Sequence, residues 1–166
     1  MSTLGIDPGL GTTGYGFVQL DENDDLQLID YGVILTPKKQ PIGIRLQVLY
    51  EQLTELLILH SPADAAVEKL FFSRNITTAI NVGQARGVAL LSLAEANIPI
   101  VEFSPPEIKQ AVTGYGGATK RQIQLMVKSL LSMEEVPKPD DAADALAIAI
   151  CQINRARYDS LVTDSL

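Results

Sequence analysis

A chain of 166 residues, 46% of them hydrophobic, can bury one core of its own, and its single cysteine excludes a disulfide framework. The net charge of −7 argues against a nucleic-acid partner unless the acids bind metal ions and the bases gather on one face. No segment resembles a signal peptide and no apolar stretch is long enough to cross a bilayer, so we expect a cytoplasmic α/β protein with no membrane contact.

The first predicted element is a short apolar strand that ends at Asp7. Pro8 fixes its own backbone angle and the glycines after it permit a sharp turn, which leaves the Asp7 carboxylate exposed at the strand end. Alternating residues predict a second strand over 14–20 and a third over 26–36, so the chain begins as an antiparallel meander. An isolated Asp-Pro-Gly is most often a plain turn, and the other acids must decide the role of Asp7.

The middle of the chain alternates between helix and strand. Periodic spacing predicts a helix over 44–60, a strand over 64–70, a long helix over 75–96 with Asn75 as its N-cap, and a strand over 99–103. A helix between two strands indicates a parallel crossover. The long helix is apolar around nearly its whole circumference, so it is either sandwiched in the core or shared with a second subunit.

The C-terminal third contains the most clearly punctuated helix of the chain. A glycine-rich loop over 114–117 is followed by Thr119, which has capping-box spacing to the residue three positions on. A last helix is expected from 141 to about 157, and a polar, frayed tail over 158–166. We therefore expect one domain over 1–157 and a short C-terminal tail.

Several acidic residues lie at predicted strand ends and at the start of the last helix, and strand ends are where α/β sheets bind ligands. Asp141 and Asp144 are spaced i, i+3 and share one face of the last helix, where Asp144 stands among Ala, Leu and Ile and would be costly to bury unpaired. Glu68 lies in a strand that is otherwise apolar, and Asp7 ends a neighbouring strand. Singly, each acid has an ordinary explanation as a cap, a turn or a surface residue. Together they predict a cup of four carboxylates, and whether Asp140 ligates metal or caps the helix stays open.

The ligand chemistry of such a cup points to a hard cation. The cup has no thiolate, and the chain has one histidine, His60, which favours Mg²⁺ over zinc, with Mn²⁺ as a possible substitute. Magnesium takes its remaining ligands from water and phosphate, so the implied substrate carries phosphate. Two ions per subunit, about 4 Å apart, would activate a water and stabilise the leaving oxygen, which is nuclease chemistry.

Basic residues flank the acids in the sequence. Lys120 and Arg121 occupy the first turn of a helix, where the macrodipole disfavours positive charge by about 0.3 kcal/mol, and they predict an anion site together with the free amides of that turn. Lys109, in a short helix that begins at the Pro-Pro pair, and Arg74 would extend a basic track for DNA. Phe71 is expected in the core by default, although an exposed phenylalanine there would stack on a base.

Three segments of the chain resemble a known family. Residues 5–9, residues 67–71 and residues 141–147 are similar, in this order, to the RuvC-type Holliday junction resolvases, and the likeness extends over nearly the whole chain. The resemblance implies an RNase H-like fold, with a central mixed five-stranded sheet of antiparallel meander plus parallel strands, flanked by helices. It also implies a homodimeric endonuclease of recombination and DNA repair, which cuts four-way DNA junctions symmetrically with divalent metal and cooperates with a branch-migration motor.

The resemblance also implies roles for individual residues. The catalytic and metal-binding acids would be Asp7, Glu68, Asp141 and Asp144. Phe71 would insert at the junction, and Lys109 and Lys120 would contact DNA. The family has a short neutral residue where this chain has Asp140.

Two other functions remain open. ATPases of the sugar-kinase and chaperone type begin with a similar turn that holds ATP phosphates, but they need two such domains around a cleft. A module that binds nucleic acid without cutting it would keep the fold and lose the chemistry. The presence of all four acids speaks against that module.

Overall fold

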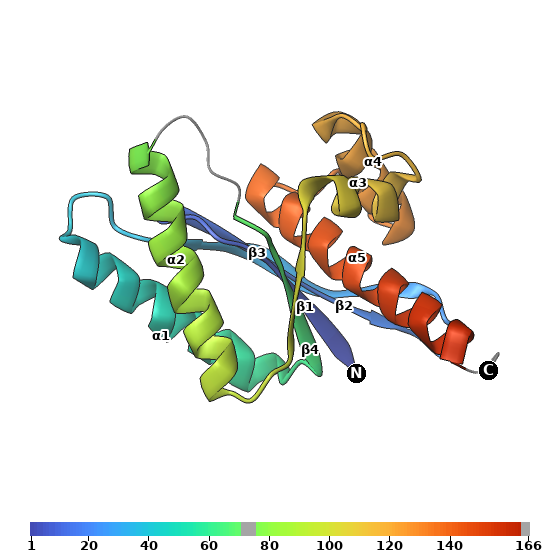
Figure 1. Cartoon of the computed structure of the whole chain (residues 1–166), viewed down its shortest axis with the longest axis horizontal. Coiled ribbons are helices and arrows are strands. Elements are labelled where there is room, and N and C mark those ends of the chain that lie inside the picture. Colours follow the sequence, from blue (N-terminus) through green and yellow to red (C-terminus); the bar gives the residue numbers. More distant parts are fainter. Residues whose placement is uncertain (71–75, 164–166) are drawn as a thin grey trace.

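The computed structural model describes residues 1–70 and 76–163. Strands come first and helices predominate later, as Figure 1 shows. In chain order the elements are β1 (Ser2–Asp7), β2 (Thr12–Leu20), β3 (Leu26–Leu35), α1 (Ile42–His60), β4 (Asp64–Glu68), α2 (Ile76–Glu95), β5 (Ile100–Phe103), α3 (Pro105–Thr113), α4 (Lys120–Leu130) and α5 (Asp140–Thr163).

The strands form one five-stranded sheet in the order β3-β2-β1-β4-β5. β1 pairs antiparallel with β2, and β2 with β3, whereas β4 pairs parallel with both β1 and β5. The predicted meander followed by parallel strands is therefore confirmed. Parallel pairing places the carboxyl ends of β1 and β4 at the same edge of the sheet, and these ends carry Asp7 and Glu68.

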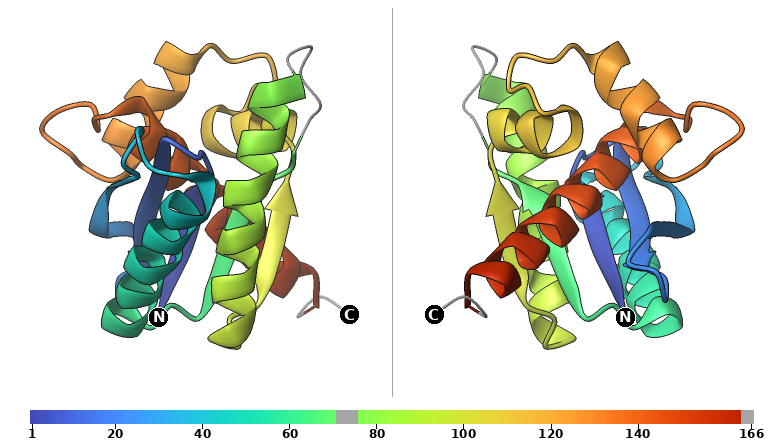
Figure 2. Two further views of the ribbon diagram at one scale, coloured as in Figure 1. Left: turned by 90° about the vertical axis from the view of Figure 1, so that its left-hand side faces the viewer. Right: turned by 90° about the vertical axis from the view of Figure 1, so that its right-hand side faces the viewer.

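Helices cover both faces of the sheet. α1 and α2 lie on one face and α5 crosses the other, with α3 and α4 beside it, so that the two views in Figure 2 show opposite helical layers in front. Leu49 and Leu53 of α1 and Ala85 and Ala89 of α2 pack against one side of the sheet. The second core centres on the apolar residues of α5, which are buried without interruption from Ala145 to Cys151.

Small residues let α5 lie directly on the sheet. A Cβ added at Gly5 of β1 would meet the carbonyl oxygen of Ala145, and one added at Gly14 of β2 would meet the carbonyl oxygen of Asp141. The alanines of α5 complete this close approach from the helix side. The first turn of α5, with its acids, is thereby held against β2.

The observed bounds differ from the predicted ones by one or two residues at several element ends, and by more at the end of the last helix. The last helix runs from Asp140 to Thr163. Residues 158–163 are therefore helical, and the expectation of a frayed tail is wrong for them. No glycine or proline interrupts this segment, and an i,i+4 pair between Arg155 and Asp159 (Nε to Oδ2, 3.5 Å) adds support. The strand expected to reach residue 70 ends at Glu68, and α1 begins at Ile42 rather than at residue 44. The predicted N-cap Asn75 lies outside the described residues.

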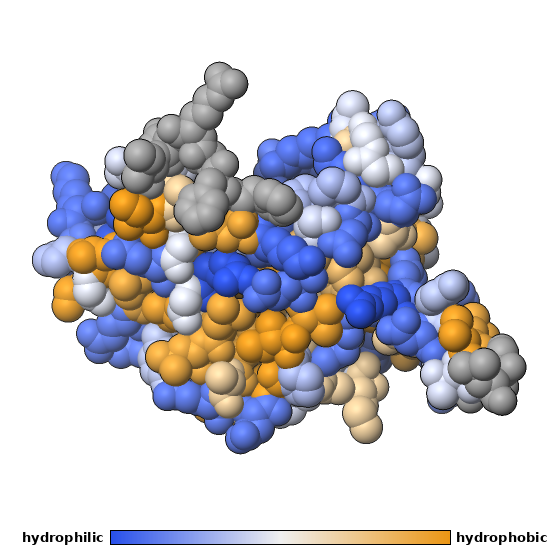
Figure 3. Space-filling view, viewed as in Figure 1, coloured by the Kyte–Doolittle hydropathy of each residue, from blue (hydrophilic) through white to orange (hydrophobic). Residues whose placement is uncertain are grey.

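One of the two alternatives for the apolar helix α2 is confirmed on one of its faces, and the other stays a prediction. Ala85, Ala89 and Leu93 are fully buried against the sheet, which confirms the core role of that face. Ile80 and Leu91 remain 55% and 53% exposed, and Figure 3 shows apolar atoms at the surface over α2. Within residues 1–70 and 76–163, no helix combines the length and the apolar character that a membrane span requires.

Candidate active site

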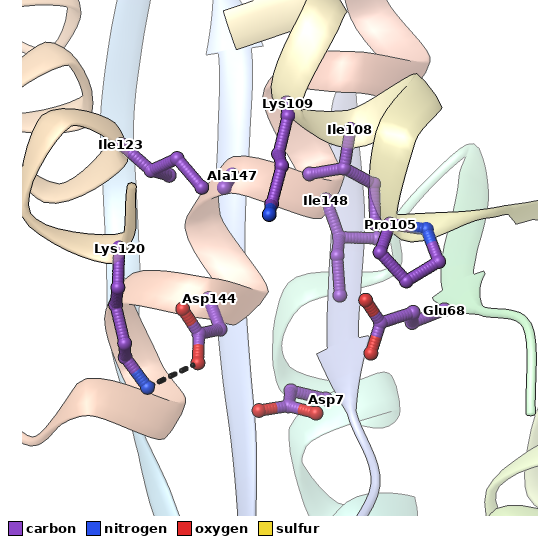
Figure 4. Close-up of a pocket in the computed structure, with 10 residues that line it drawn as sticks. All are labelled: Asp7, Glu68, Pro105, Ile108, Lys109, Lys120, Ile123, Asp144, Ala147 and Ile148. Carbon is purple, nitrogen blue, oxygen red and sulfur yellow. Dashed lines mark hydrogen bonds and ion pairs between the residues drawn. The ribbon is translucent and has the colours of Figure 1, made fainter. Parts of the chain in front are cut away.

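A cavity of about 180 Å³ opens where β1 and β4 end beneath α5. Three acids line it, Asp7, Glu68 and Asp144, and in Figure 4 the carboxylate of Asp144 is turned toward Lys120, with a hydrogen bond between them. Two bases, Lys109 and Lys120, line it as well. The remaining lining residues are Pro105, Ile108, Ile123, Ala147 and Ile148.

Each charged residue of the cavity comes from the end of an element or from one helical face. Asp7 ends β1 opposite Gly14 of β2, and Glu68 ends the neighbouring strand β4. Asp144 lies one turn into α5, on the same side as Ala147 and Ile148, which also line the cavity. The bases come from α3 and from the first residue of α4, whose capping box at Thr119 is confirmed. The cavity is therefore built from segments that are far apart in the sequence.

Polar contacts fix the loop that follows Asp7. Thr13 Oγ1 donates a hydrogen bond to the carbonyl oxygen of Gly9 at 2.8 Å, which closes the turn. Arg45 of α1 donates from Nη2 to the carbonyl oxygen of Leu10 at 3.2 Å, and from Nε to Thr36 Oγ1 at 3.1 Å. Sequence reasoning did not identify Arg45, because nothing in the helical pattern of α1 distinguishes it from a surface base.

Each acid of the cavity makes ionisation of the neighbouring carboxyl groups less favourable. Burial raises the pKa of Asp7 to about 7, and the charges of Asp144, Glu68 and Asp141 add to the increase. Burial and then Asp144 raise the pKa of Glu68. Burial also raises the pKa of Asp144, although its hydrogen bond with Lys120 opposes the increase. A cation would relieve this repulsion.

The three carboxylates of the cavity are suitable ligands for a hard divalent ion such as Mg²⁺ or Mn²⁺, because such ions prefer oxygen ligands. In the described part of the chain, no three His, Cys, Asp or Glu side chains lie close enough together to coordinate one metal ion. Instead Lys120 Nζ lies 3.0 Å from Asp144 Oδ2 and supplies a positive charge at the cavity. Asp7, Glu68 and Asp144 are the residues that would hold the ion.

The other predicted site residues lie in different places. Asp141 does not line the cavity, but its charge contributes to the raised pKa of Asp7 and of Asp144, so it lies close by. Arg121 is exposed on α4 and does not line the cavity either, and its DNA contact stays a prediction. Phe71 and Arg74 lie outside the described residues.

Asp140 belongs to a different contact. Its side chain is 63% exposed, against 33% for Asp144, and it does not line the cavity. One carboxylate oxygen, Oδ1, accepts a hydrogen bond from Gln124 Nε2 at 2.9 Å, and the other, Oδ2, lies 3.3 Å from Lys120 Nζ. The structure thus ties Asp140 to α4. Nothing in the sequence indicates that Asp140 contacts Lys120 or Gln124.

The raised pKa of Asp7 predicts that the metal-free fold loses stability with rising pH. An acid whose folded pKa is about 7, against an ordinary value of 3.8, binds more protons folded than unfolded between these values. The free energy of unfolding should fall by about 3 kcal/mol as the pH rises from about 4 to about 7. Denaturant titrations in EDTA across this range should show the fall in the parent and a shallower one in Asp7→Asn. Identical slopes would contradict the raised pKa.

Comparisons with known proteins agree along nearly the whole chain. The family model "Crossover junction endodeoxyribonuclease RuvC" matches residues 3–152. The protein of that name from Pseudothermotoga lettingae is 54% identical over 151 residues, which cover 91% of this chain and 93% of the relative. The one from Syntrophomonas wolfei is 47% identical over 165 residues, covering 99% and 95%. The solved structure "T. thermophilus RuvC in complex with Holliday junction substrate" is similar with a TM-score of 0.90 and 35% identity, covering 96% of both chains.

Proposed function

Because the chain belongs to the RuvC family of crossover junction endodeoxyribonucleases, whose solved members share its RNase H-like fold, we propose that its acid-lined cavity cuts four-way DNA junctions with Mg²⁺. The observation that carries the proposal is the meeting of Asp7, Glu68 and Asp144 in one cavity with two lysines on its wall. The ATPase alternative loses support, since it rested on the turn after β1 alone.

We assign the four acids and the two lysines separate roles. Asp7, Glu68, Asp141 and Asp144 would hold two ions, which supply water activation and stabilisation of the departing 3′ oxygen when bound; Mn²⁺ would substitute. Lys109 and Lys120, at the cavity wall, would bind the phosphates that flank the cut. Ile108 and Ile148 would exclude bulk water and strengthen these charge interactions.

The experiment that tests this function uses a synthetic four-way DNA junction. The protein is incubated with the junction in Mg²⁺ or in EDTA, and products are mapped on all four strands. We expect paired nicks at symmetric positions in opposing strands, only in Mg²⁺ and not in a linear duplex of the same sequence. Junction binding without any metal-dependent cleavage would establish the non-catalytic alternative instead. Equal cutting of the linear duplex would indicate a general nuclease.

Lys120→Ala is expected to weaken junction binding and to flatten its salt dependence. Loss of one phosphate contact should reduce the slope of log affinity against log salt by about 1. The slope is measured by gel shift in Ca²⁺ over a range of salt concentrations. Lys120→Arg keeps the charge and should keep the slope. A slope in Lys120→Ala equal to that of the parent would contradict the contact.

We also propose that the enzyme is a homodimer formed through the outer face of α2. Ile80 and Leu91 are exposed on that face, and at Gly87 between them an added Cβ would meet nothing within 4 Å. Two-fold symmetry would set two cavities on one junction and account for paired nicks. Leu91→Lys should therefore halve the mass measured by analytical ultracentrifugation, whereas Leu35→Lys, at a 62% exposed site on β3, should leave it unchanged. An unchanged mass in Leu91→Lys would refute this dimer surface.

The wider setting of the enzyme is part of the same proposal. We place it in the cytoplasm, where its DNA substrate lies, and beside a branch-migration motor that moves the junction. The family assignment supports both statements. Co-purification of the protein with such a motor on junction DNA would test the second.

A further inference from the structure

Lys120 is held by two acids of α5 that stand i, i+4 on the helix. Its ammonium lies 3.0 Å from Asp144 Oδ2 and 3.3 Å from Asp140 Oδ2. Residues four apart face the same side of a helix, so one flexible lysine can reach both carboxylates. Asp144 faces the cavity, as Figure 4 shows, and Asp140 lies outside its lining. The lysine therefore bridges the cavity and its rim.

Asp140 is itself held in place from α4. Gln124 is buried, and its Nε2 donates to Asp140 Oδ1 at 2.9 Å, which leaves Oδ2 for Lys120. The orientation of the carboxylate is thus fixed by a side chain one turn along the same helix that carries the lysine. Both side chains of the pair are more than half exposed, but the amide of the buried Gln124 fixes one oxygen of Asp140, so this carboxylate is better oriented than that of an isolated surface pair.

The two partners of Lys120 have different uses in the proposed reaction. Asp144 is needed as a ligand, and an ammonium and a divalent ion that share its carboxylate repel each other. An ion that takes Oδ2 of Asp144 displaces Lys120 from that oxygen. Asp140 is the remaining partner of the bridge, and it lies outside the lining of the cavity, so Lys120 can stay with Asp140 while an ion occupies Asp144.

We propose that Asp140 is a positioning residue, which keeps Lys120 at the rim of the cavity once Asp144 has taken a metal ion. The proposal rests on the proposed function and assigns an acid that this function leaves without a role. Asp140 then lowers the cost of moving Lys120 off Asp144, and it keeps the ammonium beside the phosphate. Both effects act through Lys120, so both should disappear when the lysine is absent.

The test is a double-variant cycle on the DNA-free protein, with Mn²⁺ binding measured by calorimetry. Lys120→Met should bind Mn²⁺ about tenfold more tightly, since no ammonium competes for Asp144. Asp140→Asn keeps the shape of the side chain and its contact with Gln124. This variant should bind Mn²⁺ about fivefold more weakly than the parent. When Lys120→Met is already present, adding Asp140→Asn should weaken Mn²⁺ binding by less than about twofold. Glu135→Gln, at an exposed acid of the loop before α5, measures the effect of lost charge alone.

Each other outcome overturns the proposal. An equal loss in both backgrounds would mean that Asp140 acts by long-range charge. Tighter Mn²⁺ binding in Asp140→Asn would mean that Asp140 clamps Lys120 onto Asp144 rather than receiving it. An unchanged affinity would remove the role altogether. If the parent itself binds no Mn²⁺, the proposed metal site fails, and the role of Asp140 fails with it.

Junction affinity in Ca²⁺ gives a second arm that does not depend on cleavage. Asp140→Asn should weaken junction binding about fivefold in the parent background and not at all with Lys120→Met. A loss that persists without the lysine would contradict the positioning role.

Discussion

Asp7→Asn is expected to abolish junction cleavage and to leave junction binding near normal. Asparagine has the shape of the carboxylate without its charge, and Asp7 is the acid whose pKa responds to Asp144, Glu68 and Asp141 together. Its loss should remove the ligand nearest the centre of the cluster. We expect cleavage to slow at least about 1,000-fold, or ~4 kcal/mol of barrier, in single-turnover assays with Mg²⁺.

The control for this prediction is Glu22→Gln. Glu22 is an exposed acid in the turn between β2 and β3, so its replacement changes the net charge equally and should leave the cleavage rate unchanged. Gel shifts of both variants in Ca²⁺ show whether binding survives. Cleavage by Asp7→Asn at the parental rate would refute the assignment of Asp7.

Gly14→Ala is expected to damage both the fold and the reaction. The added methyl group would meet the carbonyl group of Asp141 and the backbone nitrogen of Ala142, so the first turn of α5 must move away from β2. Overpacking against helix backbone should cost about 3 kcal/mol of unfolding free energy. Because that turn carries Asp141 and leads into Asp144, cleavage should fall about 100-fold even where the variant is fully folded.

Gly43→Ala is the matched control for this substitution. Gly43 lies in α1, and a Cβ there would meet nothing within 4 Å. Gly43 is the second residue of α1, so alanine should stabilise the helix by less than about 1 kcal/mol and leave cleavage unaltered. Chemical denaturation and single-turnover cleavage of both variants give the comparison. Parental stability and activity in Gly14→Ala would show that α5 does not rest on β2 as described.

The sequence predicts the sheet and the meeting of its acids because both follow from local patterns. A short apolar run predicts β1, alternation predicts β2 and β3, and a helix between strands predicts the parallel crossover to β4. Once β1 and β4 are parallel neighbours, Asp7 and Glu68 must lie at one edge. The i, i+3 spacing of Asp141 and Asp144 puts these two acids on one face of the last helix, but the packing of α5 on the sheet is what brings Asp144 to that edge.

The rest depends on contacts that no local pattern encodes. Gly14 looks like an ordinary strand residue, and its role follows only from the close approach of α5. Arg45 looks like a surface base until its bond to the Leu10 carbonyl is seen. Asp140 and Gln124 meet because α4 packs beside α5, which is a tertiary fact. The roles of Phe71 and Arg74 stay predictions.

The metal site is tested most directly by an anomalous difference map from crystals of the protein soaked in Mn²⁺. We expect a peak about 2.2 Å from carboxylate oxygens of Asp7 and Asp144, with Lys120 Nζ moved off Asp144. The peak should be lost in Asp7→Asn. A map with no peak between β1 and α5, or a peak that survives in that variant, would show that these acids do not bind the ion.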